Sequence, residues 1–77
     1  MLIKTSFFGP IRRPWPEQSK TVETPPGSTV ENLLVTLGYQ PEDMRRVAVV
    51  INGARKSLST KLTEDDDVRF VLLAGGG

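Results

Sequence analysis

The sequence of 77 residues contains no cysteine and no histidine. Without these residues the chain has no thiolate nucleophile, no disulfide, no imidazole base and none of the usual zinc ligands. Ten basic and nine acidic residues give a net charge of +1, which excludes a strong overall field for a polyanion. No apolar run approaches the roughly 20 residues of a membrane span. We therefore expect a protein that binds neither nucleic acid nor membranes and that brings little catalytic machinery of its own.

The length predicts one domain over residues 1–77. A chain this short buries only about 60% of its unfolded surface, so little room remains for an enclosed catalytic pocket. Hydrophobic residues at 38% and charged residues at 25% are typical of globular proteins. Residues 1–5 lack the charged start and long apolar stretch of a secretory signal, which predicts a cytoplasmic location.

The N-terminal part of the sequence predicts a hairpin. Residues 2–8 alternate, with Ile3, Thr5 and Phe7 on one face of a half-buried strand. Prolines at positions 10, 14 and 16 surround Trp15 and favour a rigid loop over residues 10–18, before a second strand at about residues 20–24. We expect the Trp15 indole to cover one end of a thin core, and a partner anchor is the alternative.

One helix is predicted after this hairpin. Ser28 and Glu31 have the spacing of a capping box at its start. Gly38 stands where a left-handed cap is expected at its end. The apolar residues between them follow the spacing i, i+3, i+4, i+7 and form a single stripe that can pack on a sheet: Val30, Leu33, Leu34 and Leu37.

Three further strands are expected. A polar connection over residues 41–46, with room for a short helical turn, leads to an apolar strand over residues 47–51, of the kind buried on both faces or at a sheet centre. Asn52-Gly53 is a favoured hairpin turn, so residues 54–57 should pair back briefly. Leu58 and Leu62 should anchor the next stretch to the core.

The last strand is predicted over residues 68–73, after an acidic turn at 64–67. We interpret that turn as solvated, because consecutive carboxylates on a turn seldom converge on one metal ion. Val68, Phe70 and Leu72 share one face of the strand, and Arg69, Val71 and Leu73 share the other. Val71 and Leu73 would then form an outward apolar pair for a partner to bind, unless a loop covers them.

This order of elements is typical of the α+β class and fits a β-grasp fold. We expect a mixed sheet of four to five strands, one main helix on one face, and the first and last strands side by side in the middle.

The chain closes on Gly75, Gly76 and Gly77. Glycine has no side chain to obstruct a narrow channel, so a partner's active site could admit the terminal carboxylate. The alternative is a frayed end, because chain termini are often poorly ordered.

Several pieces together resemble the ubiquitin-like sulfur carriers of the MoaD/ThiS group. They are the opening residues 2–8, residues 26–30 before Leu33-Leu34, residues 49–53, Leu62 before the acidic turn, the closing strand and the final glycines. The resemblance implies a carrier and not an enzyme, with the Gly77 carboxylate as its reactive group. Gly75 and Gly76 would thread that carboxylate into a partner, and Val71, Leu73 and Ala74 would bind the partner.

The resemblance also implies the chemistry. A ubiquitin-activating-type enzyme, using its own ATP and magnesium, would adenylate Gly77, and sulfur from a donor such as a cysteine desulfurase would displace AMP. The chain itself would bind no cofactor or metal. The resulting thiocarboxylate would serve a synthase, either the molybdopterin synthase large subunit (for molybdopterin or tungstopterin) or the thiazole synthase of thiamine synthesis.

The sequence departs from the family at the acidic turn, where Asp65-Asp66 stands in place of the usual Gly-Asp. The tail looks closer to thiazole-type members, whereas the opening and the long loop look closer to molybdopterin-type members. The pathway is therefore open, and a third sulfur-accepting pathway is an alternative. Two other functions also fit the sequence. One is a ubiquitin-like modifier joined through Gly77 to lysines of other proteins, and the other is a noncovalent β-grasp binding module.

Overall fold

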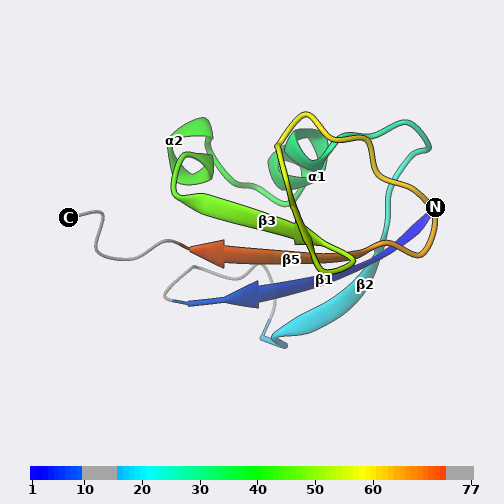
Figure 1. The fold of residues 1–77 in the computed structure, drawn as a ribbon, viewed down its shortest axis with the longest axis horizontal. Helices are drawn as coiled ribbons and strands as arrows, with labels where there is room; N and C mark the ends of the chain where they lie inside the picture. Colours follow the sequence, from blue (N-terminus) through cyan, green and yellow to red (C-terminus); the bar gives the residue numbers. More distant parts are fainter. Residues whose placement is uncertain (10–15, 73–77) are drawn as a thin grey trace.

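The computed structural model describes residues 1–9 and 16–72, except for the side chains at positions 41, 43 and 72. Its elements follow the chain in the order β1 (Leu2–Phe8), β2 (Ser19–Glu23), α1 (Val30–Thr36), α2 (Pro41–Met44), β3 (Val47–Ile51), β4 (Ala54–Lys56) and β5 (Asp67–Leu72), as Figure 1 shows. The predicted loop residues 10–15, including Trp15, lie outside the described part of the chain.

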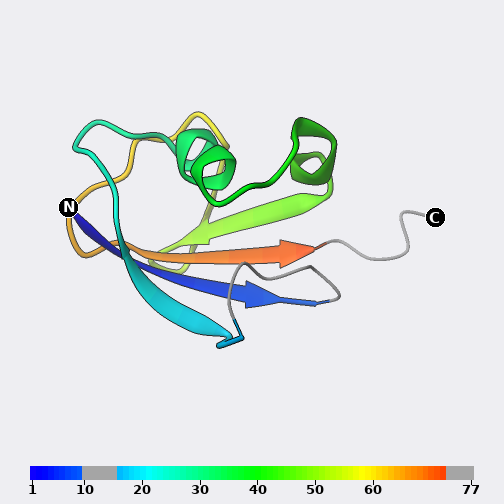
Figure 2. The same ribbon diagram turned by 180° about the vertical axis from the view of Figure 1, so that it is seen from behind.

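The five strands form one mixed sheet in the order β2-β1-β5-β3-β4. The central strand β5 runs parallel to β1, with Thr5 opposite Val68 and Phe7 opposite Phe70, and antiparallel to β3. Both helices lie on the same face of the sheet, which Figures 1 and 2 show from opposite sides. The predicted β-grasp arrangement, with the first and last strands adjacent, is therefore confirmed.

The hydrophobic core lies between α1 and the sheet. Ile3, Phe7 and Phe70 from the two central strands are almost completely buried, and the predicted stripe of α1 faces them through Val30 and its two leucines, Leu33 and Leu34. The Phe7 ring stacks on Phe70, with centroids 5.1 Å apart, and on Tyr39 at 5.8 Å. Such offset aromatic contacts add to the stability from area burial alone.

A buried threonine and two leucines from the stretch before β5 complete this core. Thr5 is fully buried beneath the helix, and its hydroxyl donates to the Lys20 carbonyl at 2.7 Å, which removes the cost of burying an unpaired hydroxyl. Leu62 is buried and Leu58 packs against the core, so the predicted anchoring of this stretch is confirmed.

The start of α1 differs from the prediction by one residue. The N-cap is Thr29, whose hydroxyl accepts from the Asn32 amide at 3.2 Å, while the Asn32 side chain accepts from the Thr29 amide at 3.0 Å. The Ser28–Glu31 capping box was wrong because the Ser28 hydroxyl donates to the Pro25 carbonyl instead.

The end of α1 agrees with the prediction. Gly38 has φ +93°, its amide donates to the Val35 carbonyl, and the Tyr39 amide donates to the Leu34 carbonyl. These two bonds form a Schellman motif, in which a left-handed residue lets the chain turn back and satisfy the last helical carbonyls.

The predicted boundaries hold within a residue or so. The helical turn expected in the polar connection is α2, β2 begins at Ser19, and β4 ends at Lys56. The strand β3 lies between β5 and the edge strand β4, so the centre of the sheet is β5. Ala48 of β3 is nevertheless buried on the helix-free face, as a nearly continuous apolar strand predicts.

Candidate functional site

The strand β5 fixes where the tail leaves the body. Near its end, Val71 pairs with Phe8 of β1 on one side and with Ala48 of β3 on the other, and Leu72 pairs with Val47. Val71 is held on both sides and Leu72 on one, so the sheet sets the position from which the chain continues. The sequence adds five residues after Leu72, ending in the three glycines.

The predicted tail residues all lie outside the described part of the chain. They are Leu73, Ala74, Gly75, Gly76 and Gly77. Their roles in partner binding, threading and activation therefore stay predictions. Among the predicted site residues, the structure describes Val71.

Val71 lies in an apolar row on the helix-free face of the sheet. Because side chains alternate along a strand and Phe70 points into the core, Val71 points away from α1. Its cross-strand neighbours Phe8 and Ala48 lie on the same face, and Val50 lies two residues beyond Ala48 along β3. We call these four residues the apolar row. Ala48 is 8% exposed, whereas the other three are half-buried.

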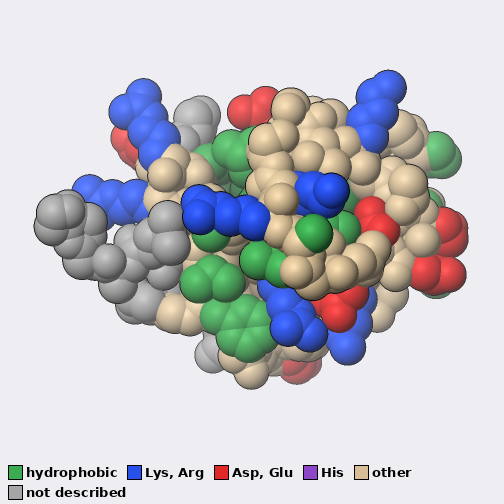
Figure 3. Space-filling model, viewed as in Figure 1, with side chains coloured by type: hydrophobic (Ala, Val, Ile, Leu, Met, Phe, Trp, Pro, Cys, Tyr) green, Lys and Arg blue, Asp and Glu red, His purple; other side chains and the backbone are tan. Residues whose placement is uncertain are grey.

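Figure 3 shows hydrophobic side chains gathered beside the C-terminal half of β5, with Lys and Arg side chains next to them. An apolar patch that reaches the surface is typical of a protein interaction site. The predicted outward-facing apolar residue at position 71 is thus part of a larger surface, to which β1 and β3 also contribute. The sequence alone does not reveal the contributions of β1 and β3, because they depend on which strands pair.

The opposite end of β5 is fixed by a buried carboxylate. Asp66 is 6% exposed. It accepts hydrogen bonds from the Thr63 amide at 2.8 Å, the Thr63 hydroxyl at 2.9 Å and the Asn52 side-chain amide at 3.0 Å. Burial alone would raise the pKa of Asp66, but these three donors together lower it below its ordinary value.

The interpretation of the acidic turn as solvated was therefore wrong for Asp66. Asn52 also accepts from the Asp67 amide through its side chain and donates its own amide to the Asp67 carbonyl. The β3–β4 turn and the start of β5 are thus joined. The spacing of Thr63 three residues before Asp66 is the sequence signal that could have revealed this local bond, since such pairs commonly cap turns.

Asp65, where the family usually has glycine, adopts φ +68°. Aspartate tolerates this left-handed conformation better than most residues do, although at some cost. The turn therefore keeps a glycine-like backbone with a different residue. Its neighbour Glu64 accepts a hydrogen bond from the Leu2 amide at 2.7 Å and ties the turn to β1.

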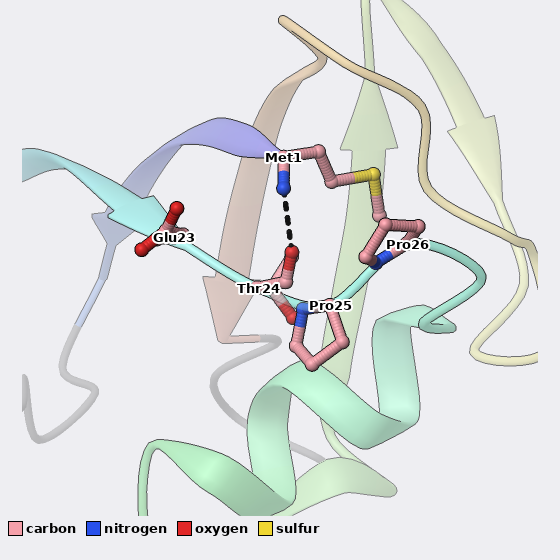
Figure 4. A pocket seen from close by; sticks show the side chains of 5 residues that line it. All are labelled: Met1, Glu23, Thr24, Pro25 and Pro26. Carbon is pink, nitrogen blue, oxygen red and sulfur yellow. Dashed lines mark hydrogen bonds between the residues drawn. The ribbon is translucent and has the colours of Figure 1, made fainter.

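An open pocket lies at the start of β1, lined by Met1, Glu23, Thr24, Pro25 and Pro26. Figure 4 shows the Met1 amine donating to the Thr24 carbonyl there. Because β1 and β5 are parallel, this pocket lies at the other end of the sheet from Leu72, as Figure 1 shows. It is therefore separate from the end of the body that leads to the tail.

Residues 1–9 and 16–72 contain no group of three or more His, Cys, Asp or Glu side chains that could hold a metal ion. Within the same residues, no helix is long and apolar enough to cross a membrane.

Comparison with solved structures supports the fold. SAMP1 from Haloferax volcanii matches with TM-score 0.74 and 17% identity over 100% of both chains. A protein described as a molybdopterin converting factor subunit 1 from Pyrococcus furiosus matches with TM-score 0.73 and 19% identity, over 92% of this chain and 95% of the other. The complex of subunits 1 and 2 of the molybdopterin-converting factor from Helicobacter pylori contains a match with TM-score 0.66 and 22% identity over 100% of both chains.

The sequence comparison is more specific. No curated protein matches the chain significantly. The model of the ThiS family, however, matches residues 6–77, which is nearly the whole chain and includes the final glycines. The chain therefore belongs to the ThiS family of small β-grasp sulfur carriers, whose members are not themselves enzymes.

Proposed function

We propose that this protein carries sulfur as a thiocarboxylate on Gly77. A ubiquitin-activating-type partner adenylates the Gly77 carboxylate with its own ATP and magnesium. A donor such as a cysteine desulfurase supplies sulfur as a persulfide, which displaces AMP to form an acyl disulfide, and a thiol reductant then cleaves that disulfide to leave the thiocarboxylate. The thiocarboxylate donates that sulfur in cofactor synthesis. Activation is needed because a carboxylate becomes a useful electrophile only when one oxygen is part of a good leaving group.

The observation that carries this proposal is the extent of the family match. It runs to residue 77 and so includes Gly75 and Gly76 as well as the proposed reactive residue. The overlap with SAMP1 also extends over the whole of both chains. Glycines leave the carboxylate on a slender arm, since three residues span about 10 Å when extended.

The apolar row supplies the proposed docking surface for the activating partner. Val71 is half-buried on the helix-free face and lies six residues before Gly77. If the strand direction continues, alternation would put Leu73 on the same face, with Ala74 leading to the glycines. A partner that binds Val71, Leu73 and Ala74 would thereby bring the tail to its nucleotide.

Two acceptors of the sulfur remain candidates. The Helicobacter pylori match comes from a complex of the two subunits of a molybdopterin-converting factor, which supports a molybdopterin synthase large subunit as acceptor. The ThiS family match supports a thiazole synthase. We propose a cytoplasmic location for either pathway, because both use ATP-dependent activation.

The test is intact mass spectrometry. The purified chain is incubated with ATP, magnesium, the ubiquitin-activating-type enzyme of the same organism, a sulfur donor and a thiol reductant. We expect a mass gain equal to the replacement of one oxygen by sulfur, and we expect no gain when ATP is omitted. Absence of this gain in the complete mixture would contradict the proposal. Conjugates to lysines through Gly77, without thiocarboxylate, would show the modifier function instead.

A tail variant tests the threading step. Gly76→Val should unfold at the same temperature as the wild type, because the described residues already form a core between α1 and the sheet. It should lose adenylation because a branched side chain crowds a narrow channel. Deletion of Gly76 and Gly77 serves as the fully inactive reference. Normal turnover by Gly76→Val would refute the threading argument, and full function of the deletion would indicate a noncovalent binding module.

A further inference from the structure

Two arginines flank one residue of the apolar row. Val50 of β3 pairs with Arg69 of β5 on one side and with Arg55 of β4 on the other. All three side chains lie on the helix-free face, because Val49 and Phe70 point into the core on the opposite face. Neighbouring strands are about 4.8 Å apart, so the two arginine Cα atoms are separated by roughly 10 Å.

Neither arginine is held in a short or buried ion pair within the described chain. Arg69 makes one ion pair, with Asp67 at 3.7 Å, and its side chain is 54% exposed. The Arg55 side chain is exposed and forms no ion pair or hydrogen bond with another described residue. A long, exposed ion pair of this kind contributes little, so both guanidinium groups are available to bind a partner.

Asp67 is the acidic residue of β5 on this face. Glu64 bonds to the backbone of Leu2, Asp66 is buried, and Asp67 is the first residue of β5. Asp67 lies beside Arg69 and opposite Lys4 of β1, so basic neighbours offset its charge, and Val71 follows toward the end of β5. In Figure 3 Lys and Arg side chains border the hydrophobic ones.

We infer that this face binds a partner surface on which an apolar side chain stands between two carboxylates about 10 Å apart. The apolar side chain would contact Val50 and Val71, and the carboxylates would bind Arg55 and Arg69. This inference rests on the proposed function, in which the occupant is the adenylating enzyme. Guanidinium groups suit this role because they bind carboxylates through paired, directional hydrogen bonds.

The two arginines would also restrict the orientation of docking. A partner with two carboxylates about 10 Å apart can bind Arg55 and Arg69 together only along the line that crosses β4, β3 and β5. Complementary charges of this kind chiefly set orientation and association rate, and they weaken as salt shortens the screening length.

The experiment compares Arg55→Glu with Lys61→Glu. The two substitutions change the net charge equally, but Lys61 bridges to Thr29 next to α1, away from the apolar row. Thiocarboxylate formation is measured by mass at increasing carrier concentration, with the adenylating enzyme, in about 50 mM and about 500 mM salt. Arg55 is the main test because it has no ion pair to lose on substitution, and Arg55→Lys tests the need for guanidinium geometry.

We expect Arg55→Glu to raise KM at least tenfold at low salt with kcat unchanged, and to lose most of that effect at high salt. Lys61→Glu should stay within about twofold of the wild type. Equal KM values for Arg55→Glu and Lys61→Glu, with an active wild type, would overturn the inference and leave the proposed function intact. An inactive wild type would overturn both. Salt-sensitive dimerisation of the carrier alone, abolished by Arg55→Glu, would identify a second copy as the occupant and also refute the inference.

Discussion

Replacement of Asp66 by asparagine tests the buried hydrogen bonds at the start of β5. The aspartate accepts from three donors, two of them on Thr63 and one on Asn52. Asparagine has nearly the same shape, but one of its two polar atoms is an amide that donates. In either orientation of the new side chain, its NH2 group lies opposite the Thr63 amide or the Asn52 side-chain amide. Both of these groups are donors, so one hydrogen bond is lost.

The expected cost follows from those contacts. A hydrogen bond to a charged group contributes about 1.5–3 kcal/mol, and a buried donor left without a partner costs about 1–3 kcal/mol. These two ranges describe the same lost bond, so we expect Asp66→Asn to lower the free energy of unfolding by about 2–3 kcal/mol. For a domain of this size that corresponds to a fall in Tm of about 10–20 °C.

The pH dependence of the free energy of unfolding gives a second, independent test. The folded pKa of Asp66 lies below its ordinary value of 3.8, so its contribution is complete at neutral pH and is lost as pH falls through the folded pKa. The difference in unfolding free energy between the wild type and Asp66→Asn should therefore be constant near neutral pH. It should shrink once the pH drops below about 4.

Urea unfolding followed by circular dichroism, repeated from pH 7 to pH 3, measures both effects. Asp65→Asn is the matched control, because it removes the same charge one residue away. Asp65 is exposed with φ +68°, a conformation that asparagine also tolerates. The reasoning fails if the two variants lose equal stability at pH 7, or if the deficit of Asp66→Asn persists unchanged in acid.

Three further changes have defined outcomes. Val71→Asp should raise the KM for the adenylating enzyme more than tenfold, as measured by thiocarboxylate formation, because it places a carboxylate in the apolar row; Val35→Asp, at a position 56% exposed on α1, is the control and should have no such effect. Thr29→Ala should lower the free energy of unfolding by about 1 kcal/mol through loss of the N-cap, measured by urea titration, and an equal loss from Ser28→Ala would contradict the assigned cap. Gly38→Ala should cost about 1–2 kcal/mol in the same titration from the left-handed backbone, since no atom beyond the neighbouring residues of the chain lies within 4 Å of the added Cβ.

The fold was largely predictable because local patterns agreed with one another. The i, i+3, i+4 spacing around Leu33 and Leu34 specified one buried helical face, and alternation in β1 put Ile3 and Phe7 on one side. A residue whose role depends on competing partners was harder to assign. Ser28 and Thr29 can both cap a helix, and the Pro25 carbonyl decides between them by occupying the Ser28 hydroxyl.

The candidate site was predictable only in part, for a different reason. Alternation along β5 correctly put Val71 on the outer face, but the row that it joins depends on strand order. Phe8 and Ala48 are 40 residues apart in sequence, and they become neighbours of Val71 only through the parallel pairing with β1 and the antiparallel pairing with β3. The acidic turn misled the prediction because composition alone does not reveal that Asp66 points inward.

The central place of β5 has a mechanical consequence. A pull on the C-terminal end of this strand, directed along its axis, loads the hydrogen bonds to β1 and β3 together and in shear. An edge strand such as β4, pulled sideways, would release its bonds one after another. An enzyme could therefore pull on the terminal segment without separating β5 from its neighbouring strands, and the folded body would resist that force.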